Sequence, residues 1–406
     1  MTQTGKRTQT EHCDILISGG GVAGLTAAVA FGASGFSVIC VDPTPPVTER
    51  DAKGADLRTT AFLQPAQTLL ETIGLWPRFA DHAAPLQVMR IVDAGGAEPT
   101  ARVVKEFNAQ EISEKPFGWN LPNWLLRREL LARLSDLPNV DFRAGVGSQS
   151  LFTRTDEARV TLTDGSQITT RLVLACDGRN SPVRDAAQIP VRTTTYGQKA
   201  LAFAVTHPVP HKNVSTEIHR SGGPFTLVPL PDYQGKPSSA VVWMERGARA
   251  RDLQNLPVDA FEKEMTRRSC GLFGDLTLAS RRTLWPIISQ SAQHMAGERV
   301  ALMAEAAHVV PPIGAQGLNM SLGDLQVLLD LAQARREGLG DVAMLNAYHK
   351  ARHAEILLRV KGIDLLNRTS MLAPRPLRDL RAFGLGALYS LPPVRRTLMQ
   401  MGLGMK

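Results

Sequence analysis

The feature that most constrains this chain is a glycine-rich turn between a short apolar strand and a helix of small residues. Residues 15–41 contain no charged side chain, a length that could span a bilayer, but six glycines divide the stretch into shorter pieces. We predict a strand over residues 15–18, a glycine turn, a helix over residues 23–33 and a second strand over residues 37–41. A βαβ unit of this kind is typical of dinucleotide-binding folds, so we expect neither a membrane span nor a signal peptide here.

The turn, Gly19-Gly20-Gly21-Val22-Ala23-Gly24, matches the spacing G-x-G-x-x-G. Gly19 permits the tight turn, Gly21 lets a pyrophosphate approach the backbone, and Gly24 lets the helix pack on the strand. The free N–H groups at the helix N-terminus favour phosphate. Asp42 ends the second strand 18 residues after Gly24, where its carboxylate can accept hydrogen bonds from ribose hydroxyls. These residues predict a cofactor that contains ADP, with FAD and NAD both open at this point.

Composition narrows the class of protein. A length of 406 residues fits two or three domains. The four cysteines lie far apart and form no CxxC pair, so we expect a reducing, cytoplasmic compartment and no metal site. Of the net charge of +8, residues 371–406 carry +5, and no basic nucleic-acid-binding motif is present elsewhere. We therefore expect no nucleic-acid partner.

Two later segments also place polar residues at strand ends. In residues 171–184 an apolar strand ends at Asp177-Gly178 and a serine opens a helix. A type I turn with a serine cap is the purely structural alternative. In residues 299–320 an apolar strand is followed by Glu305 and then by two prolines. A glycine-containing loop comes next, and after it begins an apolar helix that continues to about residue 334. This second segment exposes another helix N-terminus, which suits developing negative charge.

These three motifs, in this order, resemble the FAD-dependent aromatic hydroxylases of the para-hydroxybenzoate hydroxylase type, over about residues 14–350. Finer features are similar to the ubiquinone-biosynthesis hydroxylases, namely Asp56-Leu57-Arg58, Tyr196-Gly197-Gln198, Val242-Trp243 and Pro393-Val394-Arg395-Arg396. The resemblance implies FAD as cofactor, NAD(P)H as reductant, and attack of a flavin C4a-hydroperoxide, formed from O2, on an electron-rich phenol ring.

The resemblance also implies an α/β (α+β) fold: a Rossmann-like FAD-binding domain, an inserted antiparallel substrate sheet and a C-terminal helical tail. The sequence itself alternates in residues 200–206, 214–219, 225–229 and 239–245, a pattern that predicts antiparallel strands. We expect the FAD-binding domain over residues 1–85, 115–190 and 285–350, the substrate domain over residues 86–114 and 191–284, and the helical region over residues 351–406.

Site residues follow from the resemblance by position. The family's third motif usually reads G-D-A-A-H-x-x-x-P-x-x-G-Q-G-x-N, and this chain departs from it at Ala304-Glu305, where Gly-Asp is usual. The expected flavin-ring contacts are Gly314, Gln316, Gly317 and Asn319, and no particular acid or base is implied. The expected cofactor-binding residues are Gly19, Gly21, Gly24, Asp42, Arg58, Asn123, Arg128, Val146, Asp177, Gly178, Glu305, Gly317, Leu318 and Asn319.

Some of these residues have plain structural alternatives. Arg127 and Arg128 could form a solvated helix face, and Arg58 could form a surface ion pair. Val146, at the end of a strand predicted over residues 140–146, would meet the adenine through its backbone. We expect His308 to be a packed loop residue rather than a catalytic base.

The leading functional hypothesis is hydroxylation of a prenylated phenol in ubiquinone biosynthesis. The alternatives are a hydroxylase of a soluble phenol, or a non-catalytic flavin-binding member of a membrane-associated biosynthetic complex. Residues 373–406 combine apolar and basic side chains in proline-broken segments, which favours a peripheral location on the inner face of a membrane. The alternative is that this tail packs on the cofactor domain.

Overall fold

A mixed sheet with parallel central strands forms the centre of one half of the molecule. The structure, a computed structural model, describes residues 10–96, 100–371, 379 and 389–403. The central strands of this sheet follow the order β18-β19-β11-β1-β2-β8, and β1 pairs in parallel with both β2 and β11. The strands of this sheet are β1 (Thr10–Ser18), β2 (Val38–Asp42), β8 (Val140–Ala144), β9 (Ser148–Thr153), β10 (Ala158–Leu162), β11 (Gln167–Ala175), β18 (Ala296–Gly297) and β19 (Val300–Leu302).

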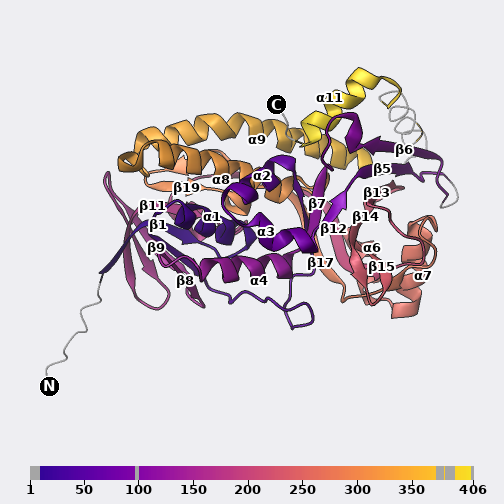
Figure 1. The fold of residues 1–406 in the computed structure, drawn as a ribbon, viewed down its shortest axis with the longest axis horizontal. Coiled ribbons are helices and arrows are strands. Elements are labelled where there is room, and N and C mark those ends of the chain that lie inside the picture. Colours follow the sequence, from indigo (N-terminus) through magenta and orange to yellow (C-terminus); the bar gives the residue numbers. More distant parts are fainter. Residues whose placement is uncertain (1–9, 97–99, 372–378, 380–388, 404–406) are drawn as a thin grey trace.

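Helices cover this sheet and enclose the larger of the two main apolar cores (Figure 1). Helix α1 is buried along its length because it is made of small and apolar residues and packs against β1, β2, α4 and α8. The helices of this half are α1 (Val22–Ala33), α2 (Gln64–Thr72), α3 (Trp76–Phe79), α4 (Asn123–Leu134), α5 (Pro182–Ala186), α8 (Gln316–Ala334) and α9 (Val342–Ser370). Short 3-10 turns are η1 (Ala80–His82), η2 (Ala109–Glu111), η3 (Ala304–Ala306) and η4 (Arg336–Gly338).

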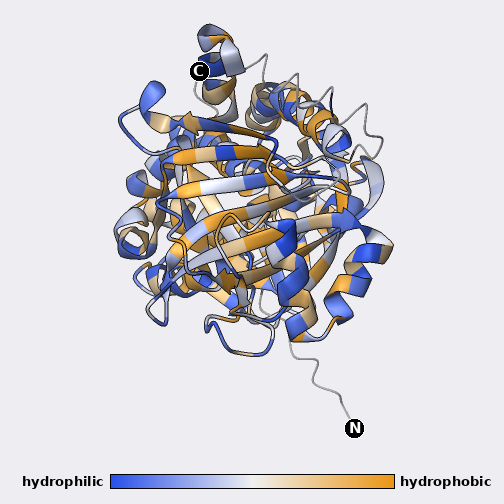
Figure 2. Cartoon of the chain, turned by 90° about the vertical axis from the view of Figure 1, so that its right-hand side faces the viewer, coloured by the Kyte–Doolittle hydropathy of each residue, from blue (hydrophilic) through white to orange (hydrophobic). Residues whose placement is uncertain are grey.

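A mainly antiparallel sheet, in which only β5 and β13 among the described strands pair in parallel, dominates the other half, at the right of Figure 1. Its order is β20-β17-β12-β15-β14-β13-β5-β6, with β16 beside β12. Figure 2 shows hydrophobic and hydrophilic residues alternating along its strands. The strands are β5 (Val88–Asp93), β6 (Val103–Asn108), β12 (Val191–Thr206), β13 (Val214–His219), β14 (Pro224–Tyr233), β15 (Lys236–Arg246), β16 (Thr277–Leu278), β17 (Thr283–Ala292) and β20 (His308–Val309).

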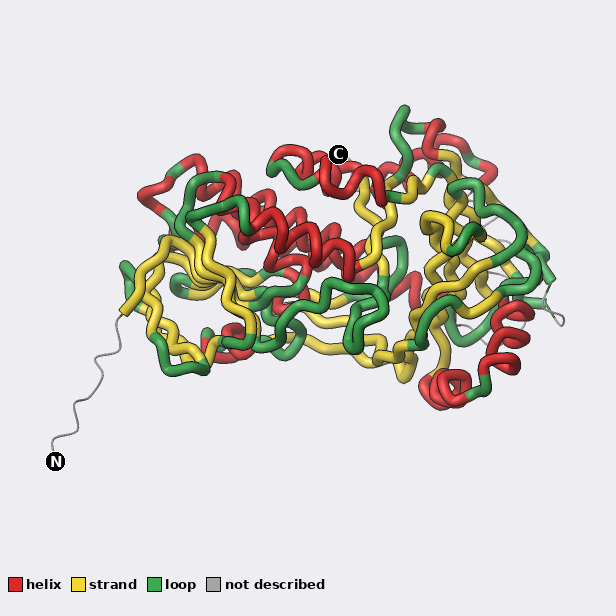
Figure 3. The backbone as a smooth tube through the Cα atoms, turned by 60° about the horizontal axis from the view of Figure 1, so that its bottom comes forward, coloured by secondary structure: helices red, strands yellow, loops and turns green. Residues whose placement is uncertain are grey.

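A second core lies between this sheet and two helices, α6 (Gly247–Asn255) and α7 (Val258–Arg268). Phe203 and Trp243 of the sheet pack against Phe261 of α7, with ring centroids 5.0 and 6.0 Å away. A small sheet of β3 (Thr59–Leu63), β4 (Ala84–Leu86) and β7 (Gly118–Pro122) completes the architecture, and Figure 3 shows the strand-rich regions at the two ends of the molecule.

The first βαβ unit and the four antiparallel strands are confirmed as predicted, and so is the α/β fold with an inserted antiparallel sheet. The boundary expected at residue 285 falls inside β17, which pairs with β12 and therefore extends the antiparallel sheet to residue 292. The boundary expected at residue 350 falls inside α9, a continuous helix of 29 residues.

Part of the C-terminal tail packs on the body of the protein. Helix α11 (Pro392–Leu403) buries Met399 and Leu403 against Leu63, Ala109 and Phe117. Apolar residues of the tail that lie outside the described residues include Leu377, Leu380, Phe383, Leu385 and Leu388.

Candidate functional site

The glycine turn before α1 has the geometry that its sequence predicts. Gly19 has φ +111°, and a Cβ there would lie 2.3 Å from the Cys176 carbonyl oxygen. A Cβ at Gly24 would lie 1.8 Å from the Gly19 oxygen, so this close packing needs glycine. At Gly21 the added atom would meet no described atom within 4 Å, and no acidic residue lies in the first turn of α1. The helix N-terminus is therefore open to an anion.

Asp42 lies beside this turn at the end of β2. Its Oδ2 accepts a hydrogen bond of 2.6 Å from the Gly20 N–H, and its Oδ1 accepts one of 2.7 Å from the Thr44 N–H. The Val146 N–H donates to the Asp42 carbonyl oxygen at 3.1 Å, so the structure brings the expected ribose and adenine contacts together. Strand β8 ends at Ala144, two residues earlier than predicted. A carboxylate has about four lone-pair sites, so Asp42 keeps acceptor capacity for a ligand.

Asp177 follows β11 and lies next to the same turn. Its Oδ2 accepts hydrogen bonds from the Ser18 hydroxyl at 3.4 Å and the Val183 N–H at 3.2 Å. Its Oδ1 is buried and has no partner among the described residues, and burial raises the pKa of this carboxyl group. Gly178, with φ +88°, also has open space where a Cβ would lie. An unpartnered buried acceptor beside an open helix N-terminus fits a ligand that carries both phosphate and hydroxyl groups.

The Ser181 hydroxyl accepts a hydrogen bond from the Arg184 N–H at 3.0 Å, so this residue caps α5. The serine cap that the sequence offered as a structural alternative is therefore real, and it coexists with the unpartnered carboxylate oxygen of Asp177.

The third motif joins the second through an ion pair. Glu305 lies in η3, its side chain is 46% exposed, and its Oε2 lies 3.4 Å from Nε of Arg179. Ala304 has φ +55° and Ala315 has φ +56°. Aligned with the motif given above, both alanines stand where the family has glycine, so Ala315 is a second departure, and Gly314-Ala315-Gln316-Gly317 is not a Gly-Gln-Gly sequence. Both residues adopt a left-handed conformation that favours glycine.

Helix α8 begins directly after Ala315. A Cβ at Gly317 would meet no described atom within 4 Å, as at Gly21. Asn319 uses its side chain within the protein: Oδ1 accepts from the Leu63 N–H at 2.9 Å, and Nδ2 donates to the Ala61 carbonyl oxygen at 2.7 Å. The Asn319 side chain is thus hydrogen-bonded within the protein, and contact of Asn319 or of the half-buried Leu318 with a flavin stays a prediction.

A largely buried carboxylate, Asp56, gathers two of the expected residues, Arg58 and Asn123, together with Arg127. Asp56 accepts two hydrogen bonds from Arg58, of 2.8 and 2.7 Å, and one of 3.0 Å from Asn123 Nδ2. Arg127 lies 3.7 Å from Asp56. Burial opposes ionisation of Asp56, but the hydrogen bonds and charge of Arg58 outweigh it and lower the pKa. The ion pair foreseen as the alternative for Arg58 is present.

Arg128 matches its structural alternative, and His308 is packed as expected. Arg128 is 38% exposed and pairs with the adjacent Glu129 at 2.9 Å, on the face of α4. His308 is fully buried, and its Nε2 lies 2.6 Å from Asp324 Oδ2. Contact between Arg128 and a cofactor stays a prediction.

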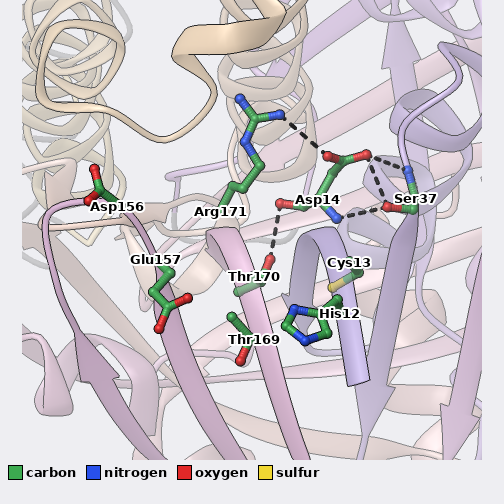
Figure 4. A pocket seen from close by; sticks show the side chains of 9 residues that line it. All are labelled: His12, Cys13, Asp14, Ser37, Asp156, Glu157, Thr169, Thr170 and Arg171. Atoms are coloured by element: carbon green, nitrogen blue, oxygen red, sulfur yellow. Dashed lines mark hydrogen bonds and ion pairs between the residues drawn. The ribbon is translucent and has the colours of Figure 1, made fainter. Parts of the chain in front are cut away.

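A shallow cavity of about 350 Å³ lies elsewhere, along the N-terminal parts of β1 and β11 (Figure 4). Within this cavity the Asp14 carboxylate accepts hydrogen bonds from Ser37 and forms an ion pair with Arg171. Ligands of open α/β sheets bind at the carboxyl ends of the strands, so this cavity is not the cofactor site. In the described part of the chain, no three His, Cys, Asp or Glu side chains group to hold a metal, and no helix is long and apolar enough to cross a membrane.

Comparison with known proteins gives consistent matches. Residues 12–359 match the FAD binding domain family. Ubiquinone hydroxylase UbiL of Rhodospirillum rubrum is 34% identical over 394 residues, which cover 96% of this chain and 89% of that protein. The 3-demethoxyubiquinol 3-hydroxylase of Escherichia coli is 27% identical and covers 97% of this chain and 98% of its own length. The solved structure of p-nitrophenol 4-monooxygenase PnpA from Pseudomonas putida has a TM-score of 0.78 at 17% identity, covering 98% of this chain and 100% of that one.

Proposed function

The chain belongs to the FAD binding domain family, and from this premise we propose that it hydroxylates the aromatic ring of a prenylated phenol during ubiquinone biosynthesis. It is an FAD-dependent aromatic monooxygenase. The observation that carries the substrate class is the 34% identity with a ubiquinone hydroxylase over nearly the whole chain. O2 is the co-substrate, and NAD(P)H is the proposed reductant.

The open residues of the site fit FAD. The N-terminus of α1 at Gly21 would hold the pyrophosphate, and Asp42 would hold the ribose. The unpartnered oxygen of Asp177 would accept a hydrogen bond from the cofactor. The backbone N–H groups around Gly317 would face the flavin ring, where fixed donors stabilise negative charge. Bound FAD supplies the oxygen activation, which no protein side chain provides.

An apolar sheet face supports the choice of substrate. Ala200, Val242, Met244 and Trp285 of the antiparallel sheet pack toward the core of the cofactor half. The guanidinium carbon of Arg58 lies 5.7 Å from the centroid of the Trp285 ring. Apolar side chains at this border would exclude water and accept a hydrocarbon chain, as a prenylated ring requires.

Deleting the gene and analysing quinones by mass spectrometry tests this function. We expect an under-hydroxylated prenylated phenol to accumulate, and its mass and fragmentation would identify the missing ring position. Normal quinone content in the deletion strain would refute the proposal and favour a soluble phenol as substrate. If a variant that cannot bind flavin abolishes this accumulation when it is expressed in the deletion strain, the protein instead has the non-catalytic role in a complex.

A peripheral membrane location on the inner face is a further part of this proposal. The outer side of α11 exposes Val394, Leu398 and Met401, opposite the buried Met399 and Leu403. Helix α9 exposes Leu358, Leu365 and Leu366. A helix that is apolar on both sides needs a second apolar surface, and a lipid headgroup layer with a prenylated substrate offers one.

Vesicle sedimentation tests this location. Replacing Leu398 and Met401 together by serine should reduce co-sedimentation with anionic vesicles at low salt while leaving the packed side of α11 unchanged. Equal co-sedimentation of the wild type and this double variant with the vesicles would refute the peripheral membrane location. Point variants are preferable to removal of the whole tail, because removal would also abolish the packing of Met399 and Leu403.

A further inference from the structure

We infer that helix α11 and Arg359 position the N-terminus of α8 against the flavin by fixing the side chain of Gln316. This inference rests on the proposed flavin site, and it assigns Gln316 and Arg359 as positioning residues rather than catalytic ones. It also makes the C-terminal helix a part of the cofactor site, although its contact residue, Gly402, lies 86 residues beyond Gln316 in the sequence.

Gln316 is the first residue of α8, and both ends of its amide are hydrogen-bonded. Its Nε2 donates to the carbonyl oxygens of Gly314 at 2.8 Å and of Gly402 in α11 at 3.0 Å. Its Oε1 accepts from Arg359 Nη1 of α9 at 2.8 Å. The side chain is buried, so each lost bond would leave a polar group without water. Its orientation is therefore fixed by the loop before α8 and by residues of two other helices, α9 and α11.

A continuous polar chain extends from Gln316 into the core. Arg359 Nε donates to Glu355 at 2.9 Å, and Glu355 also accepts from Arg352. Arg352 Nε donates to Asp324 Oδ1 at 2.8 Å, and the other oxygen of Asp324 pairs with His308. The side chains of Arg352, Asp324 and His308 are 6%, 0% and 1% exposed. The third motif is therefore held at both ends, at His308 and at Gln316, by one network.

The loop needs such support because its backbone is strained. Ala315 precedes α8 with φ +56° and provides no side-chain cap for the helix. A residue held in a sparsely populated conformation persists only when its surroundings determine it. Gln316 supplies that support through the bond to Gly314 on one side and the bonds to α9 and α11 on the other.

Helix α11 is well placed to provide a stable acceptor. Met399 and Leu403 are buried on either side of Gly402, and Arg395 donates to Glu111 at 3.0 Å. The Gly402 carbonyl oxygen is thus fixed by packing. Movement of α11 would release Gln316 and, with it, the N–H groups at the start of α8, and this would change the electrostatic field at the flavin.

Arg359→Met is the sharpest test, because it keeps most of the side-chain volume and removes the bonds to Gln316 and Glu355. A chain truncated after residue 391 removes the Gly402 acceptor independently. Arg396→Met is the matched control, since Arg396 is an exposed arginine of α11. Arg359→Lys, which keeps the charge, should rescue part of the effect.

We expect Arg359→Met and the truncated chain to bind FAD about tenfold more weakly, a loss of about 1.4 kcal/mol. The absorption band and midpoint potential of the bound flavin should also shift. In the flavin-free protein, hydrogen exchange of the amides of residues 314–320 should become faster in both variants and stay unchanged in Arg396→Met.

Unchanged exchange and an unchanged flavin spectrum in Arg359→Met would overturn the inference, and so would equal effects in Arg396→Met. These results are distinguishable from failure of the proposed function, in which the wild-type protein binds FAD but does not hydroxylate a prenylated phenol. If the truncated chain does not fold, Arg359→Met alone decides, because Arg359 is partly exposed at the surface of α9.

Discussion

Two helices, α1 and α8, begin at positions that the cofactor motifs occupy, and the protein builds their N-termini in different ways. The start of α1 depends on backbone: Gly19 and Gly24 are needed because a Cβ would clash, and Gly21 leaves open space. The start of α8 depends on side chains, since Ala315 stands in a left-handed conformation and Gln316 is held by distant helices. The first site is set by backbone contacts of the glycine turn, one of them with Cys176, whereas the second is set by side-chain contacts between separate helices.

The largest expected effect comes from filling the open space before α1. Gly21→Val should fold normally, because no described atom lies within 4 Å of the added Cβ, but the side chain would occupy the pyrophosphate position. We expect FAD affinity to fall at least about 100-fold, or about 2.7 kcal/mol. Fluorescence titration measures this affinity. Gly362→Ala in α9, which also meets open space, is the control and should bind FAD like the wild type.

Glu305 tests the second site next. If its carboxylate accepts a hydrogen bond from the cofactor, Glu305→Leu should cost about 1.5–3 kcal/mol, roughly 10- to 150-fold in FAD affinity. Glu305→Gln keeps an acceptor and should lose less. Equal FAD affinity of the wild type and the leucine variant would show that Glu305 serves only its ion pair with Arg179.

Glycine at the two strained alanines should stabilise the protein. A left-handed alanine costs about 1–2 kcal/mol, and glycine loses about 0.5–1 kcal/mol more backbone entropy on folding. We therefore expect Ala304→Gly and Ala315→Gly each to raise the free energy of unfolding by about 0.5–1 kcal/mol, as measured by urea denaturation. Ala332→Gly, inside α8, is the control and should lower it by about 1 kcal/mol. A loss of stability in the first two variants would contradict the strain argument.

The smallest effect concerns a contact of α9 away from the second site. His349 of α9 accepts a hydrogen bond from the Met295 N–H at 3.2 Å, and its pKa is lowered by burial and by the charges of His353 and His294. Because the pKa of His349 is lower in the folded protein than in the unfolded chain, its contribution to the free energy of unfolding is fully present above pH 6.5. This contribution is lost as the pH falls through the folded pKa. Solvent screening limits it to under about 0.5 kcal/mol.

Urea denaturation between pH 7.5 and 5 measures this contribution. His349→Asn keeps an acceptor but does not titrate, so its stability should fall less with decreasing pH than that of the wild type. Identical pH dependence of the two proteins would show that this histidine does not contribute.

The same contrast explains what the sequence could and could not predict. The strands and the glycine turn follow from hydrophobic periodicity and from steric rules that act within a few residues. The neighbourhood of Asp42 and Val146, which lie far apart in the sequence, is implied by the family resemblance. The network of Gln316, Arg359 and Gly402 could not be predicted, because its hydrogen bonds join residues up to 86 positions apart and leave no periodic pattern.

Other features were missed for related physical reasons. Asp56 gathers Arg58, Arg127 and Asn123 only after β3 and α4 come together, so its sequence neighbours gave little indication of its role. The positive φ of Ala304 and Ala315 is the structural reason why glycine is usual at both positions, and the sequence departure from the family motif was the available indication.

The central claim is that this flavoprotein places an oxygen atom from O2 on a prenylated phenol ring. Purified protein with FAD, NAD(P)H and a prenylated phenol should be incubated under ¹⁸O2, and the product should be analysed by mass spectrometry. We predict a hydroxylated product that carries one ¹⁸O atom and is absent with Gly21→Val. If NAD(P)H is consumed and hydrogen peroxide is the only product formed from O2, the account is contradicted. An unlabelled hydroxyl group on the product would also contradict it.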